Sequence, residues 1–234
     1  MRIFQKGFNF SQDGPGNRLV YHIAGCNMHC LWCANPQGMK ASGEHKNYSP
    51  QEIVDEAISC RMMFFDGGGV TFTGGEATLN TDELIEVLSK LKQNDIHTAI
   101  ETNGTSKRLL EILEYTDYLI MDFKHSDDEL MRKYTGTDTK VIKENYEKIC
   151  ASGRQCHIRI PLINEFNAKY HKEIADYLSS YDTTNIIFEF LRYHEYGKDK
   201  WKTEYKIKDG FVSDETVKKF VDEFKNHGLK IIST

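Results

Sequence analysis

The sequence predicts an α/β fold built on a parallel sheet, and three observations lead to this prediction. At 234 residues the chain has the length of one α/β domain, because such domains commonly reach ~250 residues. From Arg18 onward, short β-rich runs alternate with segments of helical period, which predicts parallel strands with right-handed crossovers. Such units number about six, too few to close an eight-fold barrel. We therefore expect a single domain over residues 1–234, folded as an open partial (β/α)6 barrel with a parallel sheet.

The expected strands are short runs rich in β-branched and aromatic residues, with helices in the gaps between them. They are Arg18 to Ile23, Val70 to Thr73, His97 to Glu101, Tyr118 to Asp122, His157 to Pro161 and Ile186 to Leu191, with a further one at Leu229 to Ile232.

One helix is marked at its start by Ser49, Pro50 and Glu52, which suit a capping box with proline at the first helical position. Apolar residues at helical spacing predict its buried face and that of the last helix. The first stripe is Ile53, Val54, Ala57, Ile58 and Met62, and the last is Val217, Phe220, Val221 and Phe224.

The composition is that of an ordinary globular protein, with 39% apolar and 28% charged residues. A net charge of -5 gives no reason to expect nucleic acid as a partner. No stretch approaches the ~18 apolar residues of a membrane span, and the first residues lack the apolar region of a signal peptide. We therefore expect a cytoplasmic monomer that binds neither membranes nor nucleic acid.

Three cysteines, Cys26, Cys30 and Cys33, follow the first expected strand at C-x3-C-x2-C spacing. Three thiolates can hold a four-iron cluster by three corners and leave one iron open, whereas electron-transfer clusters usually take four. The alternative is zinc, which takes four Cys or His ligands, usually from paired knuckles. No second pair is within reach, and His29 lies where one tight loop would wrap a metal with difficulty. The spacing therefore favours an iron-sulfur cluster that binds a substrate at its open iron.

The other cysteines, Cys60, Cys150 and Cys156, have no cluster spacing. We interpret them as buried apolar thiols.

Polar groups follow the expected strands one after another. They are the cysteine loop, Gly74-Gly75-Glu76, Glu101-Thr102-Asn103-Gly104, Asp122-Phe123-Lys124, Arg159 and Tyr193-His194-Glu195. Because the reactive face of a parallel barrel lies at the carboxyl ends of its strands, we expect these groups to share one pocket.

Several of these groups have a plainer interpretation as well. Gly74 and Gly75 allow close approach of a ligand, and Glu76 could then meet an ammonium group, but the three also suit a structural turn. Lys124 is either half of a solvated pair with Asp122 or a point charge for a substrate carboxylate. His194 is either a site residue or a satisfied core histidine.

Two further segments are loops by composition. Residues 11–18 form a turn-rich run before the first expected strand. Residues 197–202 are basic and carry Trp201, which suits either a solvated loop or a docking surface for an acidic electron donor.

Taken together, the motifs resemble those of the radical S-adenosylmethionine (SAM) superfamily, and most of all the glycyl radical enzyme activating family of the pyruvate formate-lyase type. The resemblance covers nearly the whole chain and rests on several motifs in one order. They are Asp13-Gly14-Pro15-Gly16-Asn17-Arg18, the cysteine motif with Trp32, Gly69 to Glu76, Thr102-Asn103-Gly104, Asp122-Phe123-Lys124 and Tyr193 to Trp201.

The resemblance implies a partial barrel of the radical SAM type and one [4Fe-4S] cluster on Cys26, Cys30 and Cys33, whose open iron is chelated by SAM. It implies that Glu76 lies near the SAM ammonium and Lys124 near its carboxylate. The implied pocket also includes Gly74, Gly75, Thr102 and Asp122, with Asn35 and His194 near the adenosyl group. Arg159 and Asp13 are implied to lie near the entering peptide.

The implied activity is reductive cleavage of SAM to a 5′-deoxyadenosyl radical, which removes a glycine Cα hydrogen from a partner enzyme. Pyruvate formate-lyase is the first candidate partner, and a flavodoxin or ferredoxin the implied reductant. The rival interpretations are a radical SAM enzyme for another peptide or small molecule, and a zinc-binding module.

Two departures from the family pattern bear on the cofactors. Glu101 stands where the pyruvate formate-lyase type often has Asp, which leaves a monovalent cation site there open. Ala34 to Tyr48 contains no cysteine, so we expect a single cluster.

Overall fold

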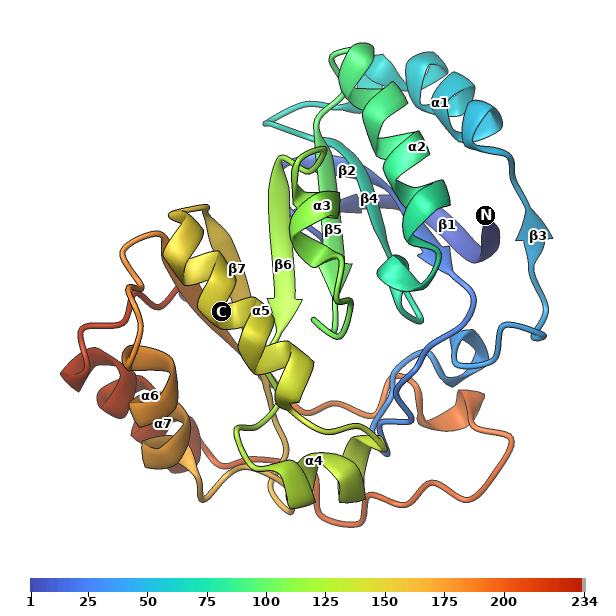
Figure 1. Ribbon diagram of the computed structural model, residues 1–234. Coiled ribbons are helices and arrows are strands. Elements are labelled where there is room, and N and C mark those ends of the chain that lie inside the picture. The colour runs from blue at the N-terminus through green and yellow to red at the C-terminus, as the bar shows by residue number, and fades with distance from the viewer. Residues whose placement is uncertain (233–234) are drawn as a thin grey trace. The chain divides into compact units, whose positions relative to one another are not determined.

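The structure is a computed structural model that describes residues 1–232. The described residues form an α/β fold with eight strands in a mostly parallel sheet and seven α-helices, which confirms the predicted class (Figure 1). The chain divides into two compact units. The first unit is Met1–Asn27, Asn35–Thr102 and Ser106–Ile120, and the second is Met28–Ala34, Asn103–Thr105 and Met121–Thr234.

The strands of the first unit follow the order β3-β1-β2-β4-β5-β6. They are β1 (Arg2–Phe10), β2 (Asn17–Ile23), β3 (Lys46–Asn47), β4 (Gly69–Gly74), β5 (Thr98–Thr102) and β6 (Tyr118–Asp122), the last two residues of β6 belonging to the second unit. β4 runs parallel to both β2 and β5, with Arg18 opposite Gly69 and Val70 opposite Thr98. The loops after these three strands therefore leave the same edge of the sheet.

β1 is an element that the sequence did not predict. It pairs antiparallel with β2, with Phe8 opposite Leu19, and carries β3 at its other edge near Arg2. Most of its side chains are exposed, so it lacks the regular apolar alternation of a half-buried strand.

The helices of the first unit are α1 (Pro50–Ser59), α2 (Thr81–Gln93) and α3 (Leu109–Leu113), and Figure 1 shows α1 and α2 lying side by side. The predicted capping box of α1 is confirmed, because Glu52 N–H donates to Ser49 Oγ and Ser49 N–H donates to Glu52 Oε2.

The predicted apolar stripe of α1 is only partly confirmed. Ile53, Val54 and Ala57 are buried, but Ile58 is 41% exposed and Met62 is 92% exposed. Ile58 lies at the edge of the stripe, and Met62 lies beyond the end of α1 in the short 3-10 helix Arg61–Met63. Placing these two residues on the buried face was therefore wrong.

In the second unit β7 (Cys156–Leu162) and β8 (Ile186–Arg192) pair in parallel, with Arg159 opposite Glu189. The helices are α4 (Asp128–Thr135), α5 (Lys140–Ser152), α6 (His171–Ser179) and α7 (Asp214–Asn226).

The last helix packs much as predicted. Phe220 and Phe224 of α7 are buried, and the Phe224 ring lies 4.8 Å from that of Phe190 on β8. Val217 and Val221 are half-buried. The strand expected at Leu229 to Ile232 is absent from the described residues, and a single bridge between Phe188 and Ile231 stands there instead.

Candidate functional site

In the first unit, the loop after β4 packs directly on the backbone of the loop after β2. Gly75 N–H donates to Ile23 O at 2.8 Å, and Glu76 N–H donates to Gly25 O at 2.7 Å. A Cβ on Gly75 would lie 2.0 Å from Gly25 O, and Gly74 has a φ of +116°, a region that favours glycine. The close neighbour of these glycines in the structure is thus the chain's own backbone.

The carboxylate of Glu76 is buried and held through one oxygen. The residue is 1% exposed. Its Oε1 accepts hydrogen bonds from Thr78 N–H at 3.0 Å, Thr78 Oγ1 at 2.6 Å and Thr102 Oγ1 at 2.5 Å. These three donors fix the orientation of a negative charge at the carboxyl end of β4. Sequence reasoning missed Thr78, although a hydroxyl two residues after Glu76 is a signal for such a bond.

Cys26 and Asn35 lie on either side of the segment that crosses into the second unit. Both side chains are half-buried. Cys26 N–H donates to Met39 O at 3.0 Å, and Asn35 O accepts from Gly38 N–H at 2.9 Å. Backbone contacts with the residue 36–39 turn therefore hold the Cys26 end of the cysteine loop.

The loop that carries Asp13 is anchored by a buried arginine. Arg18 is 0% exposed, and it donates from Nε to Thr71 Oγ1 at 2.6 Å and from Nη2 to Val70 O at 2.7 Å. Thr71 Oγ1 in turn donates to Asp13 O at 2.7 Å, while the Asp13 carboxylate accepts from Asn9. Burial lowers the pKa of Arg18 to about 10, so the side chain stays charged at neutral pH.

In the second unit, the cysteine loop Met28–Ala34 is fastened through its backbone to the end of α4. His29 N–H donates to Thr135 O at 2.7 Å, and Leu31 N–H donates to Tyr134 O at 3.0 Å. Within the loop, Cys33 N–H closes a turn to Cys30 O at 3.1 Å.

Aromatic residues support the same loop. The Trp32 ring lies 4.8 Å from that of Phe166, which packs on Tyr134 at 5.0 Å. Trp201 Nε1 donates to Cys33 O at 3.0 Å. The second and third cysteines are therefore held by contacts that do not involve their sulfur atoms.

The thiols suit a metal. All six cysteines of the chain are free of disulfides, and Cys30 is 9% exposed. Burial raises the pKa of Cys30 to about 12, and the positive charge of Lys124 opposes this shift. A coordinating metal deprotonates a thiol outright, so binding of a cation turns this buried neutral group into a ligand.

Within residues 1–232, no set of three or more His, Cys, Asp or Glu side chains is placed to share a single metal ion. A four-iron cluster does not require such a set, because each cysteine thiolate binds a different iron atom. Three thiols are the type of donor that such a cluster takes, so the lack of a single-ion set does not count against one.

Lys124 and Asp122 form a partly buried ion pair at the end of β6. Lys124 is 6% exposed and donates to the Asp122 carboxylate. Its backbone carbonyl accepts from Asn167 Nδ2 at 3.1 Å, which fixes the turn after the strand. The pair with Asp122 is therefore confirmed, but its lysine is buried rather than solvated.

Arg159 lies in a second charged cluster, between β7 and β8. It is 7% exposed and donates from Nε to Glu189 Oε2 at 2.7 Å, and His157 Nε2 lies 3.0 Å from the same oxygen. Burial favours the neutral acid, but hydrogen bonds and charge from His157 and Arg159 outweigh it and lower the pKa of Glu189. Sequence reasoning missed His157 and Glu189, because their meeting depends on strand register.

His194 is exposed rather than buried, so its interpretation as a core histidine is wrong. Its ring stacks on Tyr196 at 4.3 Å, and Tyr196 N–H donates to Nδ1 at 3.4 Å.

The structure thus joins some of the expected residues within each unit. In the first unit it joins Gly75, Glu76 and Thr102, and in the second it joins Cys30, Cys33, Asp122 and Lys124. The contacts reported above for four further expected residues do not involve these groups. The four are Asn35, Asp13, Arg159 and His194.

Comparison with known proteins identifies the family. Residues 20–178 match the model of the radical SAM superfamily, so the chain belongs to this superfamily and is a radical SAM enzyme. Membership implies a [4Fe-4S] cluster and SAM as cofactors. The zinc-binding interpretation is therefore wrong.

The more specific relatives are activating enzymes. The chain is 30% identical to the pyruvate formate-lyase-activating enzyme of Staphylococcus aureus (strain USA300), over 94% of this chain and 92% of that protein. The crystal structure of a domain of pyruvate-formate lyase-activating enzyme from Bacteroides vulgatus matches with a TM-score of 0.60 and 27% identity, over 71% of this chain and 98% of that one.

A more distant structure supports the fold alone. Streptococcus suis SuiB bound to SAM matches with a TM-score of 0.70 and 18% identity, over 92% of this chain and 49% of that one.

Among the described residues, no helix combines the length and the apolar character that a membrane span requires.

Proposed function

We propose that this radical SAM enzyme activates a glycyl radical enzyme, with pyruvate formate-lyase as the best candidate partner. The observation that carries the proposal is the 30% identity to a pyruvate formate-lyase-activating enzyme over 94% of the chain. The motif Asp13 to Arg18 and the absence of cysteines between Ala34 and Tyr48 are consistent with it.

In this proposal Cys26, Cys30 and Cys33 hold the cluster. When bound, the cluster and SAM supply one-electron cleavage of the SAM carbon-sulfur bond and abstraction of a glycine Cα hydrogen. Of the three proposed ligands, Cys30 is buried at 9% exposure, which keeps water away from that thiol.

Glu76 and Lys124 are the proposed partners of the two charged ends of the SAM methionine. Glu76 presents a carboxylate held by three hydrogen bonds, which suits an ammonium group. Lys124 presents a buried ammonium that Asp122 holds in position, and a positive point charge of this kind suits a carboxylate. Because both side chains are held in place beforehand, binding SAM costs less conformational entropy.

The remaining proposed roles follow the resemblance. Gly74, Gly75, Thr102 and Asp122 shape the SAM pocket, and Asn35 and His194 meet its adenosyl group. Asp13 and Arg159 meet the entering peptide. Thr73 Oγ1 donates to Glu101 Oε2 at 3.0 Å, so a monovalent cation at Glu101 would share this carboxylate with Thr73.

The test is an anaerobic activation assay. The reconstituted enzyme, SAM and a reductant are mixed with each candidate glycyl radical enzyme, and the glycine-centred doublet is sought by electron paramagnetic resonance. We expect a doublet with one partner, and none when that partner's glycine is replaced by alanine. Cys30→Ala should abolish both the doublet and 5′-deoxyadenosine formation.

Release of 5′-deoxyadenosine without a doublet from any candidate would overturn the activase proposal. It would favour the rival interpretation, in which the substrate is another peptide or a small molecule.

Four expectations about the whole protein stay proposals. They are a single domain over residues 1–234, a monomeric state, a cytoplasmic location and a flavodoxin or ferredoxin as reductant.

A further inference from the structure

We propose that the lysine-rich segment 198–208 is the docking surface for a small acidic electron carrier of the flavodoxin type. The inference rests on the proposed function, because a radical SAM activase must receive an electron from outside. The segment belongs to the second unit, as do Cys30 and Cys33.

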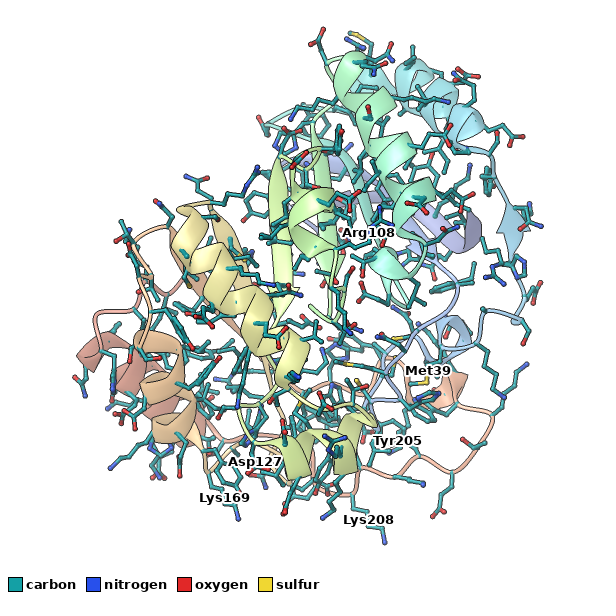
Figure 2. All side chains as sticks on the ribbon, viewed as in Figure 1. Met39, Arg108, Asp127, Lys169, Tyr205 and Lys208 are labelled. Atoms are coloured by element: carbon teal, nitrogen blue, oxygen red, sulfur yellow. The ribbon has the colours of Figure 1, made fainter. Side chains whose placement is uncertain are left out.

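The charge of the segment is opposite to that of the chain. It contains five lysines and two carboxylates, whereas the whole chain has a net charge of -5. All five lysines are exposed, and Figure 2 shows Lys208 pointing outward from its segment. A local excess of positive charge on an acidic protein steers an acidic partner to that place and speeds its association.

The segment lies directly on the cysteine loop. Trp201 Nε1 donates to Cys33 O at 3.0 Å, and Lys200 Nζ donates to Ala34 O at 3.2 Å. A Cβ on Gly197 would lie 2.4 Å from the Ala34 Cα, so the two backbones are in contact. A carrier seated on this segment is one side chain away from the residue that carries the third thiol, which gives the electron a short path.

The segment is also an ordered platform. The Trp201 and Tyr205 rings meet edge to face at 5.6 Å, and Tyr205 Oη lies 2.9 Å from Tyr193 Oη. Lys198 Nζ lies 5.8 Å from the centre of the Tyr205 ring. A surface that is ordered before the partner arrives loses less conformational entropy on binding.

The step transfers one electron and no atoms. The carrier is oxidised by one electron, from flavin hydroquinone to semiquinone, and that electron would reduce the cluster that Cys26, Cys30 and Cys33 are proposed to hold. The flavodoxin hydroquinone is anionic, so the loss of one electron leaves a neutral semiquinone and releases no proton.

The test reverses the charge of two exposed lysines of the segment and leaves Lys200, which donates to the cysteine loop, unchanged. Binding of a purified bacterial flavodoxin to the cluster-loaded enzyme is measured by isothermal titration calorimetry at low and high salt. We expect Lys202→Glu/Lys206→Glu to weaken binding about tenfold or more at low salt, and to flatten its salt dependence. The control Lys172→Glu/Lys218→Glu makes the same change of charge at exposed positions of α6 and α7, and should bind as the wild type does.

A second readout separates docking from catalysis. SAM cleavage is driven either by flavodoxin hydroquinone or by dithionite, a small reductant that needs no docking surface. The ratio of the flavodoxin-driven to the dithionite-driven rate should fall in the segment variant and stay at the wild-type value in the control.

Wild-type affinity and an unchanged ratio in the segment variant would overturn the docking proposal while the activase proposal stands. Conversely, SAM cleavage with no glycyl radical in any partner would contradict the activase proposal. The binding titration would still decide whether the segment docks the carrier.

Discussion

Thr102 donates a hydrogen bond from Oγ1 to Glu76 Oε1 at 2.5 Å, and this bond joins the end of β5 to the loop after β4. Both residues are buried, at 2% and 1% exposure. The orientation of the one carboxylate in this loop thus depends on a hydroxyl from the neighbouring strand.

Replacing Thr102 with Val should weaken SAM binding. The change removes one hydrogen bond to a buried charge, a loss of about 1.5–3 kcal/mol, and so predicts a dissociation constant roughly 10- to 100-fold higher. Calorimetry with the cluster-loaded enzyme measures it. Thr102→Ser keeps the hydroxyl and should bind SAM nearly as the wild type does, and equal affinities for the two variants would contradict the role of this bond.

Arg18→Lys should destabilise the first unit, although the charge is kept. The single ammonium group of lysine cannot replace the guanidinium group of Arg18, which donates to Thr71 and to the Val70 carbonyl at once. We expect the free energy of unfolding to fall by about 2–4 kcal/mol, because buried acceptors lose their donors. Urea denaturation measures it. The exposed Arg108, labelled in Figure 2, gives the matched control Arg108→Lys, which should unfold near the wild-type midpoint.

Phe166→Ala should loosen the cysteine loop as well as the core. The ring packs on Trp32 and on Tyr134, so its loss should cost about 3–5 kcal/mol of stability and lower the iron bound per chain after reconstitution. Phe220→Ala in α7 is the control, since it removes a buried ring that packs on Phe190. Iron content should fall in the first variant only, and a parallel fall in both would mean that lost stability is the sole cause.

His125 should make the stability of the protein sensitive to mild acid. Its ring is 2% exposed, and Nδ1 accepts from Asp127 N–H at 2.9 Å. Burial lowers its pKa from 6.5 to about 4, despite the nearby carboxylates of Asp127 and Glu173. Because the unfolded chain then binds a proton that the folded chain does not, the stabilising contribution is complete above pH 6.5 and is lost as the pH falls towards 4.

The measurement for His125 is urea denaturation across that pH range. The free energy of unfolding should drop by up to about 1.4 kcal/mol per pH unit from this group. His125→Asn keeps an acceptor for the turn. It should lower stability at every pH and remove this part of the slope, so an unchanged slope would contradict the assignment.

The parallel strands were predictable because each is a short buried run. The expected Tyr118 to Asp122 matches β6 residue for residue. β1 escaped prediction because most of its side chains face solvent. Ile58 was misplaced because it lies at the edge of the stripe, and Met62 because its helical spacing continues after α1 has ended at Ser59.

The partners of the site residues were harder to predict than the residues themselves. Glu189 meets Arg159 only through the register of β7 against β8, which no local pattern records. The glycine pair after β4 was interpreted either as space for a ligand or as a structural turn, and Gly75 lies where two loops of the chain's own backbone touch.

The anchoring of the cysteine loop has a consequence for how such sequences can diverge. The loop is tied to α4 through the amide groups of His29 and Leu31, and to Trp201 through the carbonyl of Cys33. Because every amino acid except proline supplies that amide, drift at positions 29 and 31 leaves the tether intact. The backbone tether therefore constrains the number of residues between the cysteines more tightly than the identity of the residues at positions 29 and 31.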